Sequence, residues 1–291
     1  MANDMTKAKV SKAALITGCA SGIGLVTAQH LASKGWRVYA TSRDGRGLDA
    51  LTAAGCTALA LDVNDEASMK AAVDAVVARE GAVGVLINNA GYSQSGAVEA
   101  VPMAKVRAQF ETNVFGLVRL TQLALPGMRA QRWGKVVNLS SMGGRLTFPG
   151  GGYYHATKYA VEALSDALRF EVRGFGVDVI LIEPGLIRSG FGKAATAQMA
   201  LPPVGPDDPY KEFHEAVARS TVESYEKGPL AKLAGEPLDV AKTIEKAIEA
   251  SRPRARYTVS ASAKVLLSQR ALLSDSAWDR FLRGNFPSPG A

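Results

Sequence analysis

The chain has 291 residues, of which 47% are hydrophobic and 21% charged. This size and composition suit one large α/β domain or two small ones and exclude a largely disordered chain. The net charge of +7 comes from scattered Lys and Arg residues, which we interpret as solvated helix faces rather than a nucleic-acid surface, with part of the positive field available to an anionic cofactor. The chain has two cysteines, Cys19 and Cys56, whose positions do not form a disulfide framework. Its three histidines lack the spacing of metal ligands, so we expect no metal site.

Residues 1–10 are polar and lack the apolar core of a signal peptide. No segment reaches the roughly 18 uninterrupted apolar residues that a membrane-spanning helix needs. We therefore expect a cytoplasmic protein that does not insert into a membrane.

Seven short segments, rich in apolar and β-branched residues, predict β-strands. Most are continuously apolar rather than alternating, which is typical of strands buried on both faces of a parallel sheet. Amphipathic helical segments lie between them, so the sequence predicts an α/β fold: a doubly wound parallel sheet with helices on both faces, in a single domain spanning residues 1–291. The predicted strands are residues 13–17, 37–41, 58–62, 83–88, 135–139, 177–182 and 256–259.

Two predicted helices in the N-terminal half have recognisable ends. Residues 23–34 repeat apolar side chains at helical spacing and stop before Gly35, which we interpret as the C-terminal cap. Residues 64–79 start at Asn64 or Asp65, and either side chain is a favourable N-cap because it accepts from free backbone N–H groups.

Two longer helices are predicted in the middle of the chain. Residues 102–132 suffice for one extended helix, in which Pro126 predicts a kink or break because proline lacks the N–H donor. Residues 153–173 form the second helix, which ends at Gly174.

The regular alternation is lost after Pro184. Residues 190–235 contain five prolines with helical segments between them, which predicts a substrate-lid insertion; a surface linker is the alternative interpretation. Residues 284–291 are rich in Gly and Pro and predict a flexible tail.

A glycine-rich loop follows the first predicted strand, and a helix begins directly after it. Gly18, Gly22 and Gly24 are spaced as G-x-x-x-G-x-G, which differs from the usual G-x-G-x-x-G. Glycines let the backbone turn tightly and approach a pyrophosphate, and a helix N-terminus offers free N–H groups and a positive dipole end. The strand before and the helix after favour a dinucleotide (Rossmann-type) site over a structural turn.

The end of the second predicted strand indicates which dinucleotide binds. NAD enzymes usually place an acidic residue there to hold the ribose 2′-hydroxyl. This chain has Arg43 preceded by Ser42, and a guanidinium pairs well with a 2′-phosphate, with Ser21 as a further candidate. Asp44 follows Arg43 and counts against this interpretation. We expect NADP(H) rather than NAD(H).

An ordered set of motifs runs through the rest of the chain. These motifs are Asp62-Val63, Asn88-Asn89-Ala90-Gly91, Asn113, Ser140-Ser141, Tyr154-His155-Ala156-Thr157-Lys158 and Pro184-Gly185. In this order the set resembles the short-chain dehydrogenase/reductase family over about residues 12–259. Within that family, residues 39–44 (YATSRD) and 141–144 (SMGG) look most like the hydroxysteroid and retinol dehydrogenase branch. The resemblance implies an oxidoreductase that acts on a CH–OH group or the corresponding carbonyl with NADP(H).

Tyr154 and Lys158 form the candidate proton-transfer pair. They are four residues apart and therefore share one helix face. An unperturbed phenol has a pKa near ~10, and a neighbouring ammonium lowers it by stabilising the phenolate. Tyr154 is thus the candidate general acid for ketone reduction and general base for alcohol oxidation.

The resemblance implies roles for the other catalytic residues. Ser141 stands 13 positions before Tyr154, as in the family, whereas Ser140 does not, and it would polarise the substrate carbonyl. Lys158 would also hold the nicotinamide ribose hydroxyls. Asn113 would hold a water that links Lys158 to solvent; taken alone, Asn113 is equally well a packing residue.

The resemblance also implies the cofactor contacts. Asp62 and Val63 would flank the adenine, and residues 89–91 would line the ribose. Residues 184–189 would lie beside the nicotinamide carboxamide, with Ser189 where the family often has Thr. The full implied set is Gly18, Ser21, Gly22, Ile23, Gly24, Ser42, Arg43, Asp62, Val63, Asn89, Ala90, Gly91, Tyr154, Lys158, Pro184, Gly185, Ile187 and Ser189.

Aromatic and Met side chains around the site predict a largely apolar substrate, such as a steroid, a retinoid or an aryl or alkyl ketone; each could instead pack in the core. By resemblance, the two long helices would pair subunits into a homodimer or homotetramer. The predicted substrate-binding residues are Ser141, Met142, Phe148, Tyr154, Leu186 and Phe191, with Tyr92, Ser93, Tyr153 and parts of the insertion over residues 190–235 as further pocket walls.

Two other functions are compatible with the same fold. A nucleotide-binding regulatory protein with little turnover is the alternative, although it would not need all of Asn113, Ser141, Tyr154 and Lys158. Epimerisation or dehydration on the same fold is a third possibility. A Ser-His-Asp hydrolase is excluded because the G-x-S-x-G elbow is missing, and His155 is expected to be a partly exposed helix residue.

Overall fold

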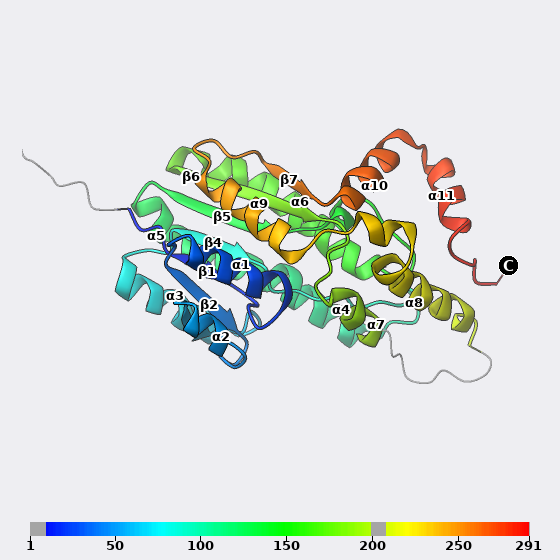
Figure 1. Cartoon of the computed structure of the whole chain (residues 1–291), viewed down its shortest axis with the longest axis horizontal. Helices are drawn as coiled ribbons and strands as arrows, with labels where there is room; N and C mark the ends of the chain where they lie inside the picture. Colours follow the sequence, from blue (N-terminus) through cyan, green and yellow to red (C-terminus); the bar gives the residue numbers. More distant parts are fainter. Residues whose placement is uncertain (1–9, 199–207, 291) are drawn as a thin grey trace, which may run out of the picture.

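Seven strands form one sheet at the centre of the molecule (Figure 1). The computed structural model describes residues 10–198 and 208–290. The strands are β1 (Ala14–Ile16), β2 (Val38–Ser42), β3 (Thr57–Ala60), β4 (Val85–Asn88), β5 (Gly134–Leu139), β6 (Val177–Pro184) and β7 (Arg256–Val259). They pair in the order β3-β2-β1-β4-β5-β6-β7, and every pair is parallel. The predicted doubly wound parallel fold is confirmed.

Helices cover both faces of this sheet (Figure 1). Successive strand residues point to opposite faces, so Ile16 packs in the layer with α1 and α9, whereas Leu15 packs with α3 and α5. The helices described are α1 (Gly22–Ser33), α2 (Asp49–Ala53), α3 (Glu66–Glu80), α4 (Met103–Phe110), α5 (Gly116–Ala130), α6 (Gly152–Val172), α7 (Phe191–Gln198), α8 (Lys211–Glu226), α9 (Pro237–Glu249), α10 (Ala261–Leu272) and α11 (Asp275–Arg283).

The predicted helix over residues 102–132 is present, but its irregularity lies elsewhere than expected. A π-helical turn, Glu111–Phe115, joins α4 to α5, and Pro126 lies inside α5 without ending it. Fully or nearly fully buried side chains on both sides of this proline, Ala124 and Met128, pack against the sheet and hold the helix together. The break predicted at Pro126 is therefore wrong, and the kink that was its alternative stays a prediction.

The predicted end of the next helix at Gly174 was also wrong. α6 ends at Val172, a 3-10 turn continues over Arg173–Phe175, and the left-handed residue is Gly176, with φ of +77°. A Cβ on Gly176 would lie 2.2 Å from the carbonyl oxygen of Arg132, whereas one on Gly174 would meet open space. The expected N-cap of α3 is confirmed, because the Asp65 side chain accepts from Ala67 N–H at 2.9 Å.

Two C-terminal helices, α10 and α11, follow β7 and were not predicted. Ser260 and Ser274 cap them through their side chains, and Trp278 of α11 is 5% exposed. The predicted tail starts at residue 284, yet Phe286 packs against the buried Phe213 of α8.

Some predictions fall on residues 1–9, 199–207 and 291, which lie outside the described residues. They concern the N-terminus, part of the insertion over residues 190–235 and the end of the tail. Among the helices of the described ranges, none is long and apolar enough to cross a membrane.

Candidate active site

The glycine-rich loop joins β1 to α1 at the carboxyl edge of the sheet. Gly22 has φ of +59°, which L residues rarely adopt, and a Cβ on Gly24 would lie 2.3 Å from the carbonyl oxygen of Gly18. Ser21 is the N-cap of α1, and its side chain makes no capping bond. The first N–H groups of α1 thus keep no side-chain acceptor, as an incoming pyrophosphate requires. Cys19 in this loop is buried, and burial raises the pKa of its thiol to about 12.

A second loop, after β4, is bonded to the glycine-rich loop. Asn89 donates through Nδ2 to the carbonyl oxygens of Thr17 (2.8 Å) and Gly18 (3.1 Å). In return, Thr17 Oγ1 accepts from the backbone N–H groups of Asn89 and Ala90, each at 2.9 Å. Residues predicted from two distant motifs are therefore fixed side by side. Thr17 was not predicted, although its place between a strand and the first glycine was the available signal.

Asp44 counted against the pairing of Arg43 with a 2′-phosphate, and the loop after β2 shows what Asp44 contacts. The Asp44 carboxylate pairs with Arg46 at 2.5 Å, and this guanidinium lowers the pKa of Asp44. Ser42 Oγ donates to the carbonyl oxygen of Arg46 at 2.7 Å. Arg43 itself lines the cavity. Asp44 is thus engaged by its own loop and does not neutralise Arg43.

A cavity of about 1310 Å³ extends along this edge of the sheet, from the loop after β2 to α8 and α11. Among the predicted cofactor and catalytic residues, Gly24 and Asn113 do not line it; they lie behind its wall. All six predicted substrate-binding residues line it. The predicted residues in its wall are Gly18, Ser21, Gly22, Ile23, Ser42, Arg43, Asp62, Val63, Asn89, Ala90, Gly91, Ser141, Met142, Phe148, Tyr154, Lys158, Pro184, Gly185, Leu186, Ile187, Ser189 and Phe191.

One predicted pocket wall was wrong, and several were missed. The Tyr153 hydroxyl donates to the carbonyl oxygen of Val98 at 2.9 Å, because neighbouring residues of α6 point in different directions, and Tyr153 is outside the cavity wall. The insertion over residues 190–235 contributes to the wall as predicted, through Val217, Ser220, Thr221, Ser224, Tyr225 and Leu230. The missed residues come from the C-terminal part of the chain, whose packing needs contacts across the whole chain. They include Leu266, Phe281, Asn285 and Phe286.

Tyr154 and Lys158 lie together in the wall of the cavity. The Lys158 ammonium is 5.8 Å from the centre of the Tyr154 ring and donates to the carbonyl oxygen of Leu139 at 2.7 Å. Burial raises the pKa of Tyr154 to about 12, opposed by a hydrogen bond with Ser141. The pKa of Tyr154 thus shifts in the direction opposite to the one expected from Lys158, because burial of the phenol is the largest cause.

For Lys158, burial shifts the pKa downward instead of upward. Burial lowers its pKa to about 8, and the carboxylate of Glu162 opposes that shift. Its amine nevertheless donates a hydrogen bond to the carbonyl oxygen of Leu139, which holds it in place. The lysine therefore changes charge close to neutral pH rather than far above it.

Ser141 ends β5 and starts the 3-10 turn Met142–Gly144. Its Oγ accepts from Gly143 N–H at 3.0 Å and lies 3.4 Å from the carbonyl oxygen of Pro184. Together with its hydrogen bond to Tyr154, this places the hydroxyl between the ends of β5 and β6. The serine at the predicted spacing is thus the one that meets the tyrosine.

Asn113 lies in the π-helical turn and is 1% exposed. Its Oδ1 accepts from Tyr92 N–H at 3.0 Å, and its Nδ2 donates to Tyr92 O at 2.9 Å and to Thr157 Oγ1 at 3.1 Å. A Cβ on Gly91 would lie 3.1 Å from Asn113 Oδ1 and 3.9 Å from Lys158 Nζ. Asn113 therefore sits behind Gly91 and close to Lys158, and Thr157 is a partner that the sequence did not indicate.

His155 is 8% exposed, so the prediction of a partly exposed residue was wrong. Nδ1 donates to Gly143 O at 3.0 Å, and Nε2 accepts from Phe148 N–H at 3.2 Å. Side chains at Gly143 or Gly151 would clash with the imidazole, so two glycines make room for it. Burial lowers the pKa of His155, which acts as a neutral link between two loops of the site.

Comparisons with known proteins agree with this geometry. A family model described as short chain dehydrogenase matches residues 12–200. The chain is 36% identical to the Helicobacter pylori protein named "Probable short-chain type dehydrogenase/reductase VdlC", over 93% of this chain and 96% of that protein. It is 34% identical to the NADPH-dependent 3-dehydrocapnine reductase of Ornithobacterium rhinotracheale, over 92% of this chain and 94% of that protein.

Two solved structures share the fold. A short-chain dehydrogenase from Streptomyces avermitilis matches with a TM-score of 0.76 and 33% identity, over 95% of this chain and 99% of that one. The closed form of serine dehydrogenase complexed with NADP+ matches with a TM-score of 0.72 and 25% identity, over 85% of this chain and 94% of that one.

Proposed function

Because the chain belongs to the short-chain dehydrogenase family and is therefore an oxidoreductase, we propose that it moves a hydride between NADP(H) and a ketone or secondary alcohol, with Tyr154 giving or taking the proton. The observation that carries this proposal is the meeting of Ser141, Tyr154 and Lys158 in one cavity with the glycine-rich loop. The nicotinamide, when bound, supplies or accepts the hydride.

The glycine-rich loop, the N-terminus of α1 and Arg43 support NADP(H) as the cofactor. The tight glycine backbone, the N-terminus of α1 and the cavity above them suit a pyrophosphate. Arg43 lies in the same cavity, where its guanidinium would pair with a 2′-phosphate and so favour NADP(H) over NAD(H). The relative named as NADPH-dependent and the solved structure with NADP+ support this preference.

Four side chains would carry out the proton transfer. The Ser141 hydroxyl would hold the substrate oxygen next to the Tyr154 hydroxyl, and Tyr154 would donate to that oxygen during reduction. Its raised pKa suits the role of acid, because the phenol keeps its proton until the substrate oxygen takes it. The charged form of Lys158 would stabilise the phenolate left behind, and Asn113 would hold the water through which Lys158 is reprotonated.

The substrate end of the cavity favours a neutral, largely apolar ketone. Phe148, Leu186 and Phe191 supply apolar surface, and α8 adds the hydroxyls of Ser220 and Ser224. Within the described residues, the acidic and Arg side chains of the cavity wall all belong to its adenosine half, and the other charged side chain in the wall is Lys158 beside Tyr154, so the substrate end offers no guanidinium to a carboxylate. A steroid-, retinoid- or alkyl-ketone-like substrate satisfies these conditions.

The described parts of the insertion, residues 190–198 and 208–235, would form the lid over this end. Phe191 and Ala195 of α7, Val217 and Tyr225 of α8 and Leu230 line the cavity. The Phe191 ring lies 5.5 Å from that of Tyr154. Movement of this insertion would thus open or close the space directly beside the reacting oxygen.

The test is a titration with NADPH and NADH, followed by NADPH oxidation with a panel of steroid, retinoid, aliphatic and aromatic ketones. We expect tight NADPH binding and turnover on one class of apolar ketone, with charged keto acids as the matched control class that is not reduced. Tight binding without turnover on any carbonyl would contradict the proposal and favour a regulatory nucleotide-binding protein.

A further inference from the structure

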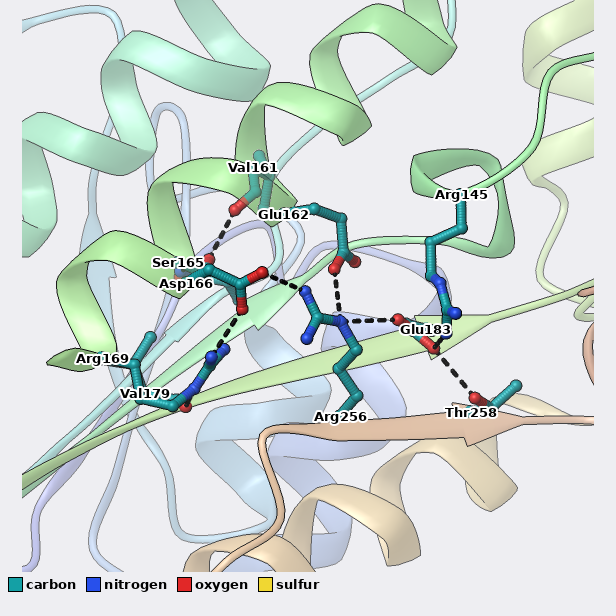
Figure 2. A network of polar contacts seen from close by, with 11 residues as sticks. Arg145, Val161, Glu162, Ser165, Asp166, Arg169, Val179, Glu183, Arg256 and Thr258 are labelled. Carbon is teal, nitrogen blue, oxygen red and sulfur yellow. Dashed lines mark hydrogen bonds and ion pairs between the residues drawn. The ribbon is translucent and has the colours of Figure 1, made fainter. Parts of the chain in front are cut away.

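A cluster of charged side chains lies behind the proton-transfer pair, between α6 and strands β6 and β7 (Figure 2). The carboxylates of Glu162 and Glu183 are 8% and 0% exposed, respectively, and both face Arg256. Arg256 Nε is 2.9 Å from Glu162 Oε2 and 3.3 Å from Glu183 Oε1. Buried carboxylates are costly even when paired, so their presence next to the site calls for an explanation beyond packing.

Glu162 follows Lys158 by one turn of α6, so the two side chains emerge from the same face of the helix. A Cβ on Gly144 would lie 2.9 Å from Glu162 Cγ, 3.1 Å from the carbonyl oxygen of Lys158 and 2.8 Å from Ser140 Oγ. Glu162 therefore lies directly behind the loop that carries Ser141. Its carboxylate raises the pKa of Lys158 against the effect of burial.

We propose that Glu162 is a positioning residue for the reaction: its carboxylate, held by Arg256, keeps the ammonium of Lys158 charged beside Tyr154. The inference rests on the proposed function, because a charged Lys158 matters only if Tyr154 must release and regain a proton. Glu162 touches neither substrate nor cofactor, since it is not part of the cavity wall.

Ser140 and Arg256 favour the ionised form of Glu162 through their hydrogen bonds and, for Arg256, its charge. They oppose burial and the charge of Glu183, which together raise the pKa of Glu162. On the strand side, Glu183 accepts from Thr258 Oγ1 at 2.9 Å and lies 3.6 Å from Arg145 Nη1. Glu183 thus also contacts Thr258 and Arg145, and Arg256 lies closer to Glu162 than to Glu183 (Figure 2).

Asp166 lies one turn beyond Glu162 on α6 and provides a matched control. Its Oδ2 is 2.6 Å from Arg256 Nη2, so it shares the same cation, and Arg169 also pairs with it. Its side chain is 47% exposed, and it is eight residues from Lys158 rather than four. Solvent screening and the greater separation weaken its effect on the ammonium.

The test compares Glu162→Gln with Asp166→Asn through the pH profile of kcat/KM for ketone reduction. Glutamine can still accept from Arg256 but carries no charge, so the alkaline limb should move to lower pH by about one unit. Turnover would then fall several-fold near pH 8 and stay close to wild type near pH 6. Asp166→Asn should keep the wild-type profile, and Glu162→Asp, which keeps the charge, should restore it.

A second measurement reads the lysine without turnover. Lys158 lines the cavity, so its amine can be reductively methylated with ¹³C-formaldehyde and a borane reductant and titrated by NMR, with Lys158→Met to assign the signal. The inference predicts that this signal titrates at lower pH in Glu162→Gln. Identical titrations and superimposed profiles, or an equal shift in Asp166→Asn, would overturn it. If the wild type reduces no ketone, the proposed function fails, while the NMR titration still decides whether Glu162 sets the charge of Lys158.

Discussion

Single side chains in this site are governed by the competition between burial and nearby charge. Lys158 is buried and Tyr154 is half-buried, and desolvation pushes each toward its neutral form. Ser141 and Glu162 oppose these shifts from outside the pair. The sequence motif identifies the pair, but the direction of each pKa depends on neighbours that only the fold brings together.

The first residue-level prediction concerns Arg43. Replacing it with Ala removes the guanidinium that would pair with the 2′-phosphate but leaves the glycine-rich loop intact. We expect NADPH binding to weaken roughly 10- to 100-fold, the size of a charge-assisted hydrogen-bond loss, and NADH binding to stay within about 2-fold. Fluorescence titration of both cofactors measures this, with Arg252→Ala, at an exposed arginine outside the cavity wall, as the control. Equal losses for NADPH and NADH would contradict the 2′-phosphate role.

A second prediction concerns the stability contributed by His155. Its folded pKa is lowered by burial, so as pH falls the unfolded chain takes up a proton before the folded one does. The stability contributed by neutral His155 is therefore present above the ordinary histidine pKa of about 6.5 and is lost as pH falls below it. We expect Tm to drop between about pH 7 and pH 5.5.

The variant His155→Gln should have a lower Tm at neutral pH because it loses a bond to Gly143 or Phe148, but its Tm should change less over that range. His30→Gln, on the half-buried pair with Glu245, is the matched control. A drop of the same size in His155→Gln and the wild type would show that another group causes it.

At the scale of elements, close backbone contacts decide where helices end. Gly176 is left-handed and packed against the carbonyl oxygen of Arg132, whereas Gly174, two residues earlier, faces open space. We expect Gly176→Ala to lower stability by about 2 kcal/mol and Gly174→Ala to be neutral or slightly stabilising. Urea denaturation of both variants measures the difference. Equal effects would contradict this account of the end of α6.

Elements near a local signal could be predicted, and those defined by distant contacts could not. Asp65 caps α3 as expected, and the strands and glycine-rich loop lie where apolar runs and glycine spacing place them. Helices α10 and α11 were missed because their apolar residues, such as Trp278, become a core only against Phe148, far away in the chain. His155 was misjudged for the same reason, since Gly143 and Gly151 make its pocket.

For the whole molecule, exposed apolar side chains on the long helices support self-association. Phe170 of α6 is 88% exposed, Leu164 43% and Phe115, in the turn before α5, 54%. We propose that these helices pair two copies of the chain, and we expect Phe170→Asp to shift the mass in solution toward the monomer. Light scattering after size-exclusion chromatography measures this, with Leu272→Asp, at another exposed apolar position, as control. A monomeric wild type would contradict the prediction.

The central claim about this molecule is that Tyr154 donates the proton in an NADPH-dependent ketone reduction. The most direct measurement compares wild type and Tyr154→Phe for NADPH binding and for turnover on the same ketone. We predict unchanged NADPH affinity within about 3-fold and a loss of turnover of at least ~10²-fold, as expected for removal of a general acid. Turnover close to that of the wild type in Tyr154→Phe would contradict the proposed mechanism.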